Sequence, residues 1–349
     1  LKNIILFSFF SAIAIDIRLM GIIMPFIIVF ILFLNTIMKT KNYKNFFLSA
    51  FYIMILTFSF VIIMWPMLWE NPIINLINVF NNLANFPLTG YNLYLGSLVP
   101  ISETPWHYMP IWILATTPLT YSFIFLIGIV KFTNDIFHKK NIDLFLKDLT
   151  FILIFFSPIL AIITLNSSLY DGWRHMYFTY PCFVILGLIG IEWFLKIIKN
   201  NKLYYLIQFI IIFSLFNTGY WMVKNHPHQN VFFNKFVRTN VNKIFVLDYI
   251  AASYKVNLDY LVENEKKNKY YIFNSSETKL FYPLFSLKDE IRLKFIVSKK
   301  ENAEYWITNH HFDKETYDDD FYEKYEILNE VIVDGNKINS LFKVKNYSK

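Results

Sequence analysis

The sequence predicts a polytopic α-helical membrane protein that carries a small α/β domain at its C-terminal end. Of its 349 residues, 55% are hydrophobic and 20% aromatic, and the mean hydropathy is positive, which is too apolar for an ordinary soluble domain. Apolar windows of about 20 residues, the length that a spanning helix needs, recur up to Val223. Residues 224–349, in contrast, hold 20 of the 33 Lys and Arg and 18 of the 26 Asp and Glu. We therefore expect a multi-span domain over residues 1–223 and an extracytoplasmic domain over residues 224–349.

The first apolar run, residues 4–38, is interrupted by Asp16 and Arg18 and then by Gly21 and Pro25. A buried Asp and Arg pair in the middle of a membrane would be costly. We therefore expect two short helices that meet at a polar break, and a single tilted helix with an internal ion pair is the alternative. In either case the location of Arg18 makes it a functional candidate.

The later apolar windows predict further spans, for about six or seven membrane segments in total. Short cytoplasmic loops are enriched in Lys and Arg, and here the basic residues fall in alternate links. The loop of residues 66–108 holds no Lys or Arg and only Glu70 and Glu103 as charges, so we expect it on the outer face with the C-terminal domain. The windows are 46–65, 109–130, 149–165, 178–195 and 203–223, and the basic links are marked by Lys39, Lys41 and Lys44, by Lys131, Lys139, Lys140 and Lys147, and by Lys196, Lys199 and Lys202.

Within the outer loop, residues 73–86 alternate apolar and Asn positions at helical spacing. This pattern predicts an amphipathic helix in the membrane interface, either as a structural lid or in contact with substrate. In the C-terminal domain, residues 257–266 are expected to form a helix. The expected strands are residues 270–273, 294–297, 305–308, 325–333 and 341–344, so a small α/β unit fits best.

Several function classes lose support. The chain has no phosphate loop, no dinucleotide fingerprint and no serine-hydrolase elbow. The net charge of +7 divides into +5 in short membrane loops and +2 in a domain of mixed charge, so nucleic acid is not an expected partner. His310 and His311 with Asp313, and His226 with His228, lack a third ligand at a recognisable spacing, so no metal or other cofactor is predicted, although a divalent metal stays open.

The link from Tyr170 to Pro181 is the most informative segment, because it places Asp171, Arg174 and His175 between two apolar runs. A guanidinium offers a planar fork of donors to phosphate oxygens, so a lipid phosphate at the outer interface is one explanation. The other is that a short link must carry polar groups and that Arg174 simply pairs with Asp171. The residues alone leave both open.

Four segments together resemble one family. They are Tyr-Asp-Gly-Trp-Arg-His at residues 170–175, His-Pro-His-Gln-Asn-Val-Phe-Phe-Asn at 226–234, Trp-Pro-x-x-Trp-Glu-Asn-Pro at 65–72, and Asp248-Tyr249. They look like the bacterial multi-span glycosyltransferases of the GT-C type, related to family 39 and the protein mannosyltransferases. The resemblance covers most of the chain.

This resemblance implies an enzyme of the bacterial inner membrane that moves a sugar from a polyprenyl-phosphate donor to an acceptor glycan, lipid or protein at the outer face. The family's catalytic carboxylate lies in a first outer loop that has no counterpart here, so we expect an N-terminally truncated chain and assign no catalytic base. We expect Arg18, Arg174 and His175 to bind the donor phosphate. The candidates for the substrate cavity are Asp171, Trp173, Glu70, Trp69 and His107.

A transporter or flippase of lipid-linked glycans is the alternative function. It would favour discontinuous helices in two related halves, a pattern that the sequence does not show. A third hypothesis is an assembly protein that the membrane part only anchors, but a link dense in Trp, Arg and His would then be unnecessary.

Overall fold

The computed structural model describes residues 1–84, 90–138, 141–312 and 317–345. The chain divides into two compact units. The helical unit comprises residues Leu1–Gly90, Pro100–Ile113 and Leu119–Phe209, and the sheet unit comprises Tyr91–Val99, Leu114–Pro118 and Ile210–Lys349. The predicted domain boundary after Val223 stays a prediction.

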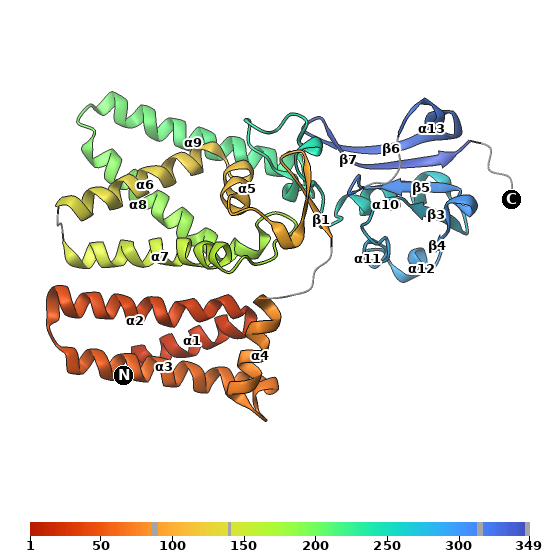
Figure 1. Cartoon of the computed structure of the whole chain (residues 1–349). Coiled ribbons are helices and arrows are strands. Elements are labelled where there is room, and N and C mark those ends of the chain that lie inside the picture. Colours follow the sequence, from red (N-terminus) through yellow and green to blue (C-terminus); the bar gives the residue numbers. More distant parts are fainter. Residues whose placement is uncertain (85–89, 139–140, 313–316, 346–349) are drawn as a thin grey trace. The chain divides into compact units, whose positions relative to one another are not determined.

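Six helices in the described part of the chain are long enough and apolar enough to cross a membrane, which agrees with the expected polytopic class. They cover Leu19–Thr40, Tyr43–Met64, Leu119–His138, Ile142–Thr164, Arg174–Ile197 and Asn201–Lys224. Figure 1 labels the helices up to residue 224, which are α1 (Lys2–Ile17), α2 (Ile23–Asn35), α3 (Tyr43–Met64), α4 (Pro72–Ala84), α5 (Tyr108–Thr116), α6 (Leu119–His138), α7 (Ile142–Thr164), α8 (Tyr180–Ile197) and α9 (Asn201–Lys224).

The first apolar run forms two helices, as predicted. Helix α1 ends at Ile17, and Arg18 adopts an extended conformation (φ −154°, ψ 119°) before a short 3-10 turn leads into α2. Both Asp16 and Arg18 are exposed, so neither charge is buried within a helix bundle. The turn lies close to α1, because a Cβ on Gly21 would come within 2.6 Å of the Ala14 backbone. The single-helix alternative is therefore wrong.

The predicted span over residues 109–130 is wrong as one continuous helix. Helix α5 ends at Thr116 and α6 begins at Leu119, so the apolar run is interrupted at Thr117 and Pro118. Proline disfavours the helical conformation of the residue before it and has no N–H for the helix ladder. The candidate span is α6 alone.

One ion pair links two of the basic connections. The Nζ of Lys39, after α2, lies 2.6 Å from the carboxylate of Asp143 in the first turn of α7. The α2 to α3 connection and the start of α7 therefore lie at the same end of the helical unit. Lys139 and Lys140 lie outside the described residues.

The predicted amphipathic helix corresponds to α4, which begins at Pro72. Its apolar residues Ile73, Ile74 and Ile77 are 67%, 60% and 54% exposed. The predicted continuation to Phe86 lies outside the described residues. A helix with its apolar side open agrees with an interfacial location, but the choice between lid and substrate contact stays a prediction.

The sheet unit contains a mixed five-stranded sheet in the order β4-β3-β5-β7-β6. Strand β3 runs parallel to both neighbours, while β7 is antiparallel to β5 and β6. All five strands agree with the predicted ones, although β7 begins earlier. The bounds are β3 (Tyr270–Asn274), β4 (Phe295–Val297), β5 (Tyr305–Thr308), β6 (Tyr325–Val333) and β7 (Asn336–Val344).

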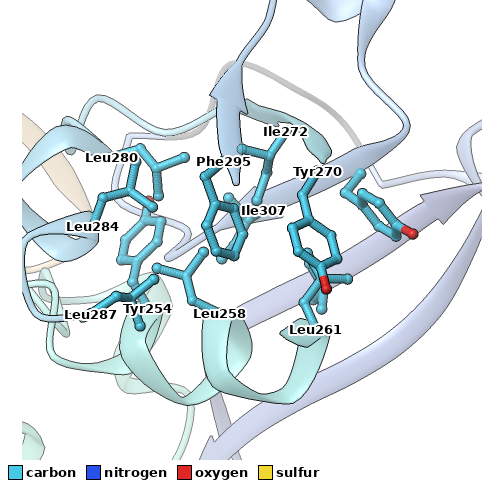
Figure 2. Packing of buried hydrophobic residues seen from close by; sticks show 12 residues of the cluster. Tyr254, Leu258, Leu261, Tyr270, Ile272, Leu280, Leu284, Leu287, Phe295 and Ile307 are labelled. Carbon is cyan, nitrogen blue, oxygen red and sulfur yellow. The ribbon is translucent and has the colours of Figure 1, made fainter. Parts of the chain in front are cut away.

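Helix α10 (Ser253–Glu265) covers the predicted helix except for its last residue, Lys266, and supplies one side of the core of this unit. Figure 2 shows Tyr254, Leu258 and Leu261 of α10 facing Ile272 and Ile307 of the sheet. Other elements of the unit include the hairpin of β1 (Tyr91–Tyr94) and β2 (Ser97–Pro100), which the sequence predicted only as loop, and the short helices α11 (Phe281–Leu284), α12 (Asp289–Arg292) and α13 (Asp319–Lys324).

Candidate functional site

The polar link between α7 and α8 folds into a tight turn followed by a 3-10 helix. Asp171 and Gly172 both adopt left-handed conformations (φ 53° and 75°), and a 3-10 helix then runs over Arg174–Thr179 into α8. The N–H of Gly172 donates a hydrogen bond of 3.1 Å to the hydroxyl of Tyr108. A Cβ on Gly172 would lie 3.4 Å from the ring of Trp112, so α5 supports the turn directly.

The charged side chains of the link contact each other. Arg174 lies 3.0 Å from the carboxylate of Asp171, and its guanidinium stacks 4.9 Å from the centre of the Tyr170 ring. Burial raises the pKa of Asp171, an effect that the charge of Arg174 only partly opposes. The side chain of Arg174 is still 33% exposed. The pairing that the residues left open is therefore present, and the Arg174 side chain stays partly exposed.

A second arginine, Arg18, also contacts this link, although it follows α1 near the start of the chain. Arg18 donates a hydrogen bond through Nη1 to the backbone carbonyl of His175, and its Nη2 lies 3.4 Å from Nδ1 of the same residue. With Nδ1 facing a permanent cation, the neutral ring carries its proton on Nε2. That Nε2 is buried and has no hydrogen-bond partner among the described residues. We call Arg18, Asp171, Arg174 and His175 the outer cluster.

This arrangement suits an anion. The guanidinium of Arg18 contacts His175, and Arg174 is the residue before it in the chain. A buried N–H without a partner is a costly state that an acceptor oxygen would relieve. Because arginine stays charged at any relevant pH, the cluster carries a permanent positive charge that Asp171 offsets only in part.

The other predicted substrate-cavity residues have different surroundings. Trp173 is only 5% exposed and packs its ring edge-on against Tyr177 at 4.8 Å. Trp69 is 63% exposed and donates from its indole N–H to the carbonyl of Ile62, and the neighbouring Glu70 is exposed. His107 is half-buried with its ring against Trp106. The structure therefore brings Arg18, Asp171, Arg174, His175 and Trp173 into one region, and their predicted roles stay predictions.

An apolar cavity of about 450 Å³ lies between α1, α2, α3 and α4. Ile15 and Ile22, on either side of Arg18 in the chain, both line it. All its lining residues except Thr57 are apolar, and Thr57 is buried with a hydroxyl that has no partner in the described part of the chain. The volume lies in the range of ligand pockets, about 300 to 1,000 Å³.

The helical unit contains a further cluster of charged side chains that the sequence did not predict. We call it the inner cluster. Lys131 in α6 pairs with Asp135 at 2.6 Å and with Asp148 of α7. All three side chains are at most 12% exposed. The spacing of Lys131 and Asp135, four residues apart in an apolar helix, was the available signal.

The predicted histidine groups of the sheet unit serve local contacts. His310 lies 2.9 Å from the hydroxyl of Ser340, and His311 lies 3.0 Å from that of Thr278. Asp313 lies outside the described residues. Across residues 1–84, 90–138, 141–312 and 317–345, no three His, Cys, Asp or Glu side chains are grouped to hold a metal ion.

No family model, curated protein or solved structure matches this chain. The outer cluster and the apolar cavity are therefore the features of this chain that bear on its function.

Proposed function

We propose that this chain is a polytopic glycosyltransferase of the GT-C type in the bacterial inner membrane, with its C-terminal domain outside the cytoplasm. It takes a sugar from a polyprenyl-phosphate donor and passes it to an acceptor at the outer face. The single observation that carries the proposal is the contact of Arg18 with His175, residues separated by 157 positions, beside the partly exposed side chain of Arg174.

The chemistry of the donor explains why such a cluster is useful. When the bond from the sugar to the phosphate breaks, negative charge grows on the departing phosphate, and fixed cations stabilise that charge more than they stabilise the intact donor. Arg18 and Arg174 would supply the charge, and the Nε2 proton of His175 would supply a hydrogen bond. No residue is assigned as the base that activates the acceptor, and no metal is part of the proposal.

The prenyl chain of such a donor needs an apolar environment beside the phosphate site. The apolar cavity provides such an environment. Two of its lining residues, Ile15 and Ile22, precede and follow Arg18 in the chain, and Val61 of α3 lines it as well. A ligand with a charged head and an apolar tail would therefore place its head at the outer cluster and part of its tail in the cavity.

The test uses the natural full-length protein in proteoliposomes with undecaprenyl-phosphate-linked glucose and mannose as probes and a membrane extract as the source of acceptor. We expect Arg174→Ala to abolish formation of a new glycosidic bond while membrane insertion is unchanged. The matched control is Lys199→Ala, which removes a positive charge from the connection between α8 and α9.

Retained transfer by Arg174→Ala would contradict the assignment of that residue. Movement of labelled probe across the bilayer without a new glycosidic bond would instead support a transporter of lipid-linked glycans.

A further inference from the structure

The segment around α11 is apolar on two opposite sides. Leu280, Leu284 and Leu287 point into the core of the sheet unit (Figure 2) and are at most 7% exposed. Phe281, Tyr282 and Phe285 alternate with them and are 61%, 70% and 53% exposed. A helical segment that is apolar on both sides is usually buried on both sides. The exposed side with Phe281, Tyr282 and Phe285 is therefore expected to contact an apolar environment.

The outer side forms one continuous surface. The ring of Phe281 lies 4.6 Å from that of Phe285 and 5.7 Å from that of Tyr282. Tyr282 also lines a cavity of about 500 Å³ together with Ile250, which is 52% exposed. We call Ile250, Phe281, Tyr282 and Phe285 the aromatic face.

The chain itself indicates what covers this face. Pro227 lines the same cavity and follows Lys224, the last residue of the candidate span α9, by three residues. Three residues reach at most about 10 Å. The headgroup region on each side of a bilayer is on the order of 5 to 8 Å thick. One wall of the cavity is therefore close to the level at which α9 leaves the membrane.

The charged residues beside the aromatic face do not favour binding to a strongly anionic surface. The cavity wall carries Lys255 and Asp259, which pair at 2.7 Å, and Arg292 stacks on Phe285 at 4.5 Å beside its own partner Asp289. Each of these two pairs is neutral overall, so neither adds net positive charge beside the aromatic face. The contact should depend on apolar and aromatic side chains, which favour the membrane interface, and should be insensitive to salt.

We propose that the aromatic face of the sheet unit inserts into the outer interface of the bilayer that α9 crosses. The partner is the lipid surface itself, at the boundary between headgroups and acyl chains. This inference depends on the membrane location in the proposed function but not on sugar transfer.

The test measures the depth of spin labels on the full chain in phosphatidylcholine vesicles, with Cys182, the single cysteine, replaced by Ser. Labels are attached to Tyr282→Cys and, as a second variant of the same face, to Phe281→Cys. We expect oxygen to relax both labels more effectively than a water-soluble nickel complex does, at low and at high salt.

The matched control is Ile327→Cys on β6, which is 46% exposed. The turn after β6 is tied to α9, because Asp334 accepts a hydrogen bond of 2.8 Å from Trp221. Ile327 lies seven residues before Asp334, which in a strand corresponds to roughly 23 Å. Its label should be more accessible to nickel than to oxygen.

A label at Phe216→Cys distinguishes failure of the inference from failure of the membrane location. Phe216 lies in the second half of α9 and is 75% exposed. If the labels at 281 and 282 are as accessible to nickel as the label at 327 while that at 216 is lipid-embedded, the inference is wrong and the membrane location stands. If the label at 216 is also in water, the membrane location itself fails. Dipolar broadening between labels at 282 on different copies would indicate self-association and would also overturn the inference.

Discussion

The helical unit holds two charged clusters that differ in how completely they are closed. In the inner cluster, Lys131 contacts both Asp135 and Asp148, and no side chain is more than 12% exposed. In the outer cluster, Arg174 is 33% exposed and the Nε2 of His175 is buried with no partner among the described residues. In a closed cluster each charge is compensated by a partner, so removing one partner is destabilising, whereas an open cluster retains capacity for a ligand.

The inner cluster should show the largest effect on stability. Removing one member of a buried ion pair leaves an uncompensated charge and typically costs about 3 to 5 kcal/mol. We expect Lys131→Met to lower the free energy of unfolding by about that amount, measured by thermal unfolding in detergent.

The same change combined with Asp135→Asn and Asp148→Asn should recover part of the loss, because no uncompensated carboxylate then remains. A triple variant as unstable as Lys131→Met alone would mean that packing rather than charge holds α6 and α7 together here.

The outer cluster should instead affect binding. A hydrogen bond to a charged group is worth about 1.5 to 3 kcal/mol, which corresponds to roughly ten- to hundredfold in affinity. We expect Arg18→Ala to weaken binding of undecaprenyl-phosphate glucose by that factor, as measured by retention of the lipid in native mass spectrometry. Lys202→Ala, at the other end of the helices, is the control, and an equal loss in both variants would point to a general charge effect.

Asp171 should make binding sensitive to pH, because it competes with the ligand for Arg174. Burial raises its pKa, so the carboxyl takes up its proton at a higher pH in the folded chain than in the unfolded chain. Its contribution to stability is therefore gained as pH falls through the raised pKa and lost as pH rises through it. Over the same interval the freed Arg174 should bind the phosphodiester probe more tightly.

The variant Asp171→Asn should bind the probe a few-fold more tightly at neutral pH and should lose this pH dependence. Affinity measured from pH 7 down to pH 4 checks both points, because the charge of a phosphodiester is constant across that range. An unchanged pH profile would assign the titration to another group.

The smallest expected effect is that of Arg174→Ala on the free energy of unfolding. Partly exposed ion pairs contribute about 0 to 1 kcal/mol, because solvent screens them. Thermal unfolding should therefore shift little, in contrast to Lys131→Met. A loss comparable to that of Lys131→Met would make the outer cluster structural as well.

Much of the fold followed from local patterns. The length and apolarity of the windows predicted most candidate spans, the charges at Asp16 and Arg18 predicted the break, and alternation predicted the strands of the sheet unit. The window over residues 109–130 failed because hydropathy averages over Pro118, while helix continuity depends on each backbone N–H.

The sequence by itself determined which segments are apolar enough to leave water and which residues carry charge between them, since both are properties of composition over short distances. It could not determine that Arg18 meets His175, or that Lys131 meets Asp148, because those contacts arise only when distant helices pack. Whether a charged side chain is satisfied or left with an unused donor depends on that packing. Tertiary structure therefore decided which polar groups are compensated by their neighbours and which keep an unused donor.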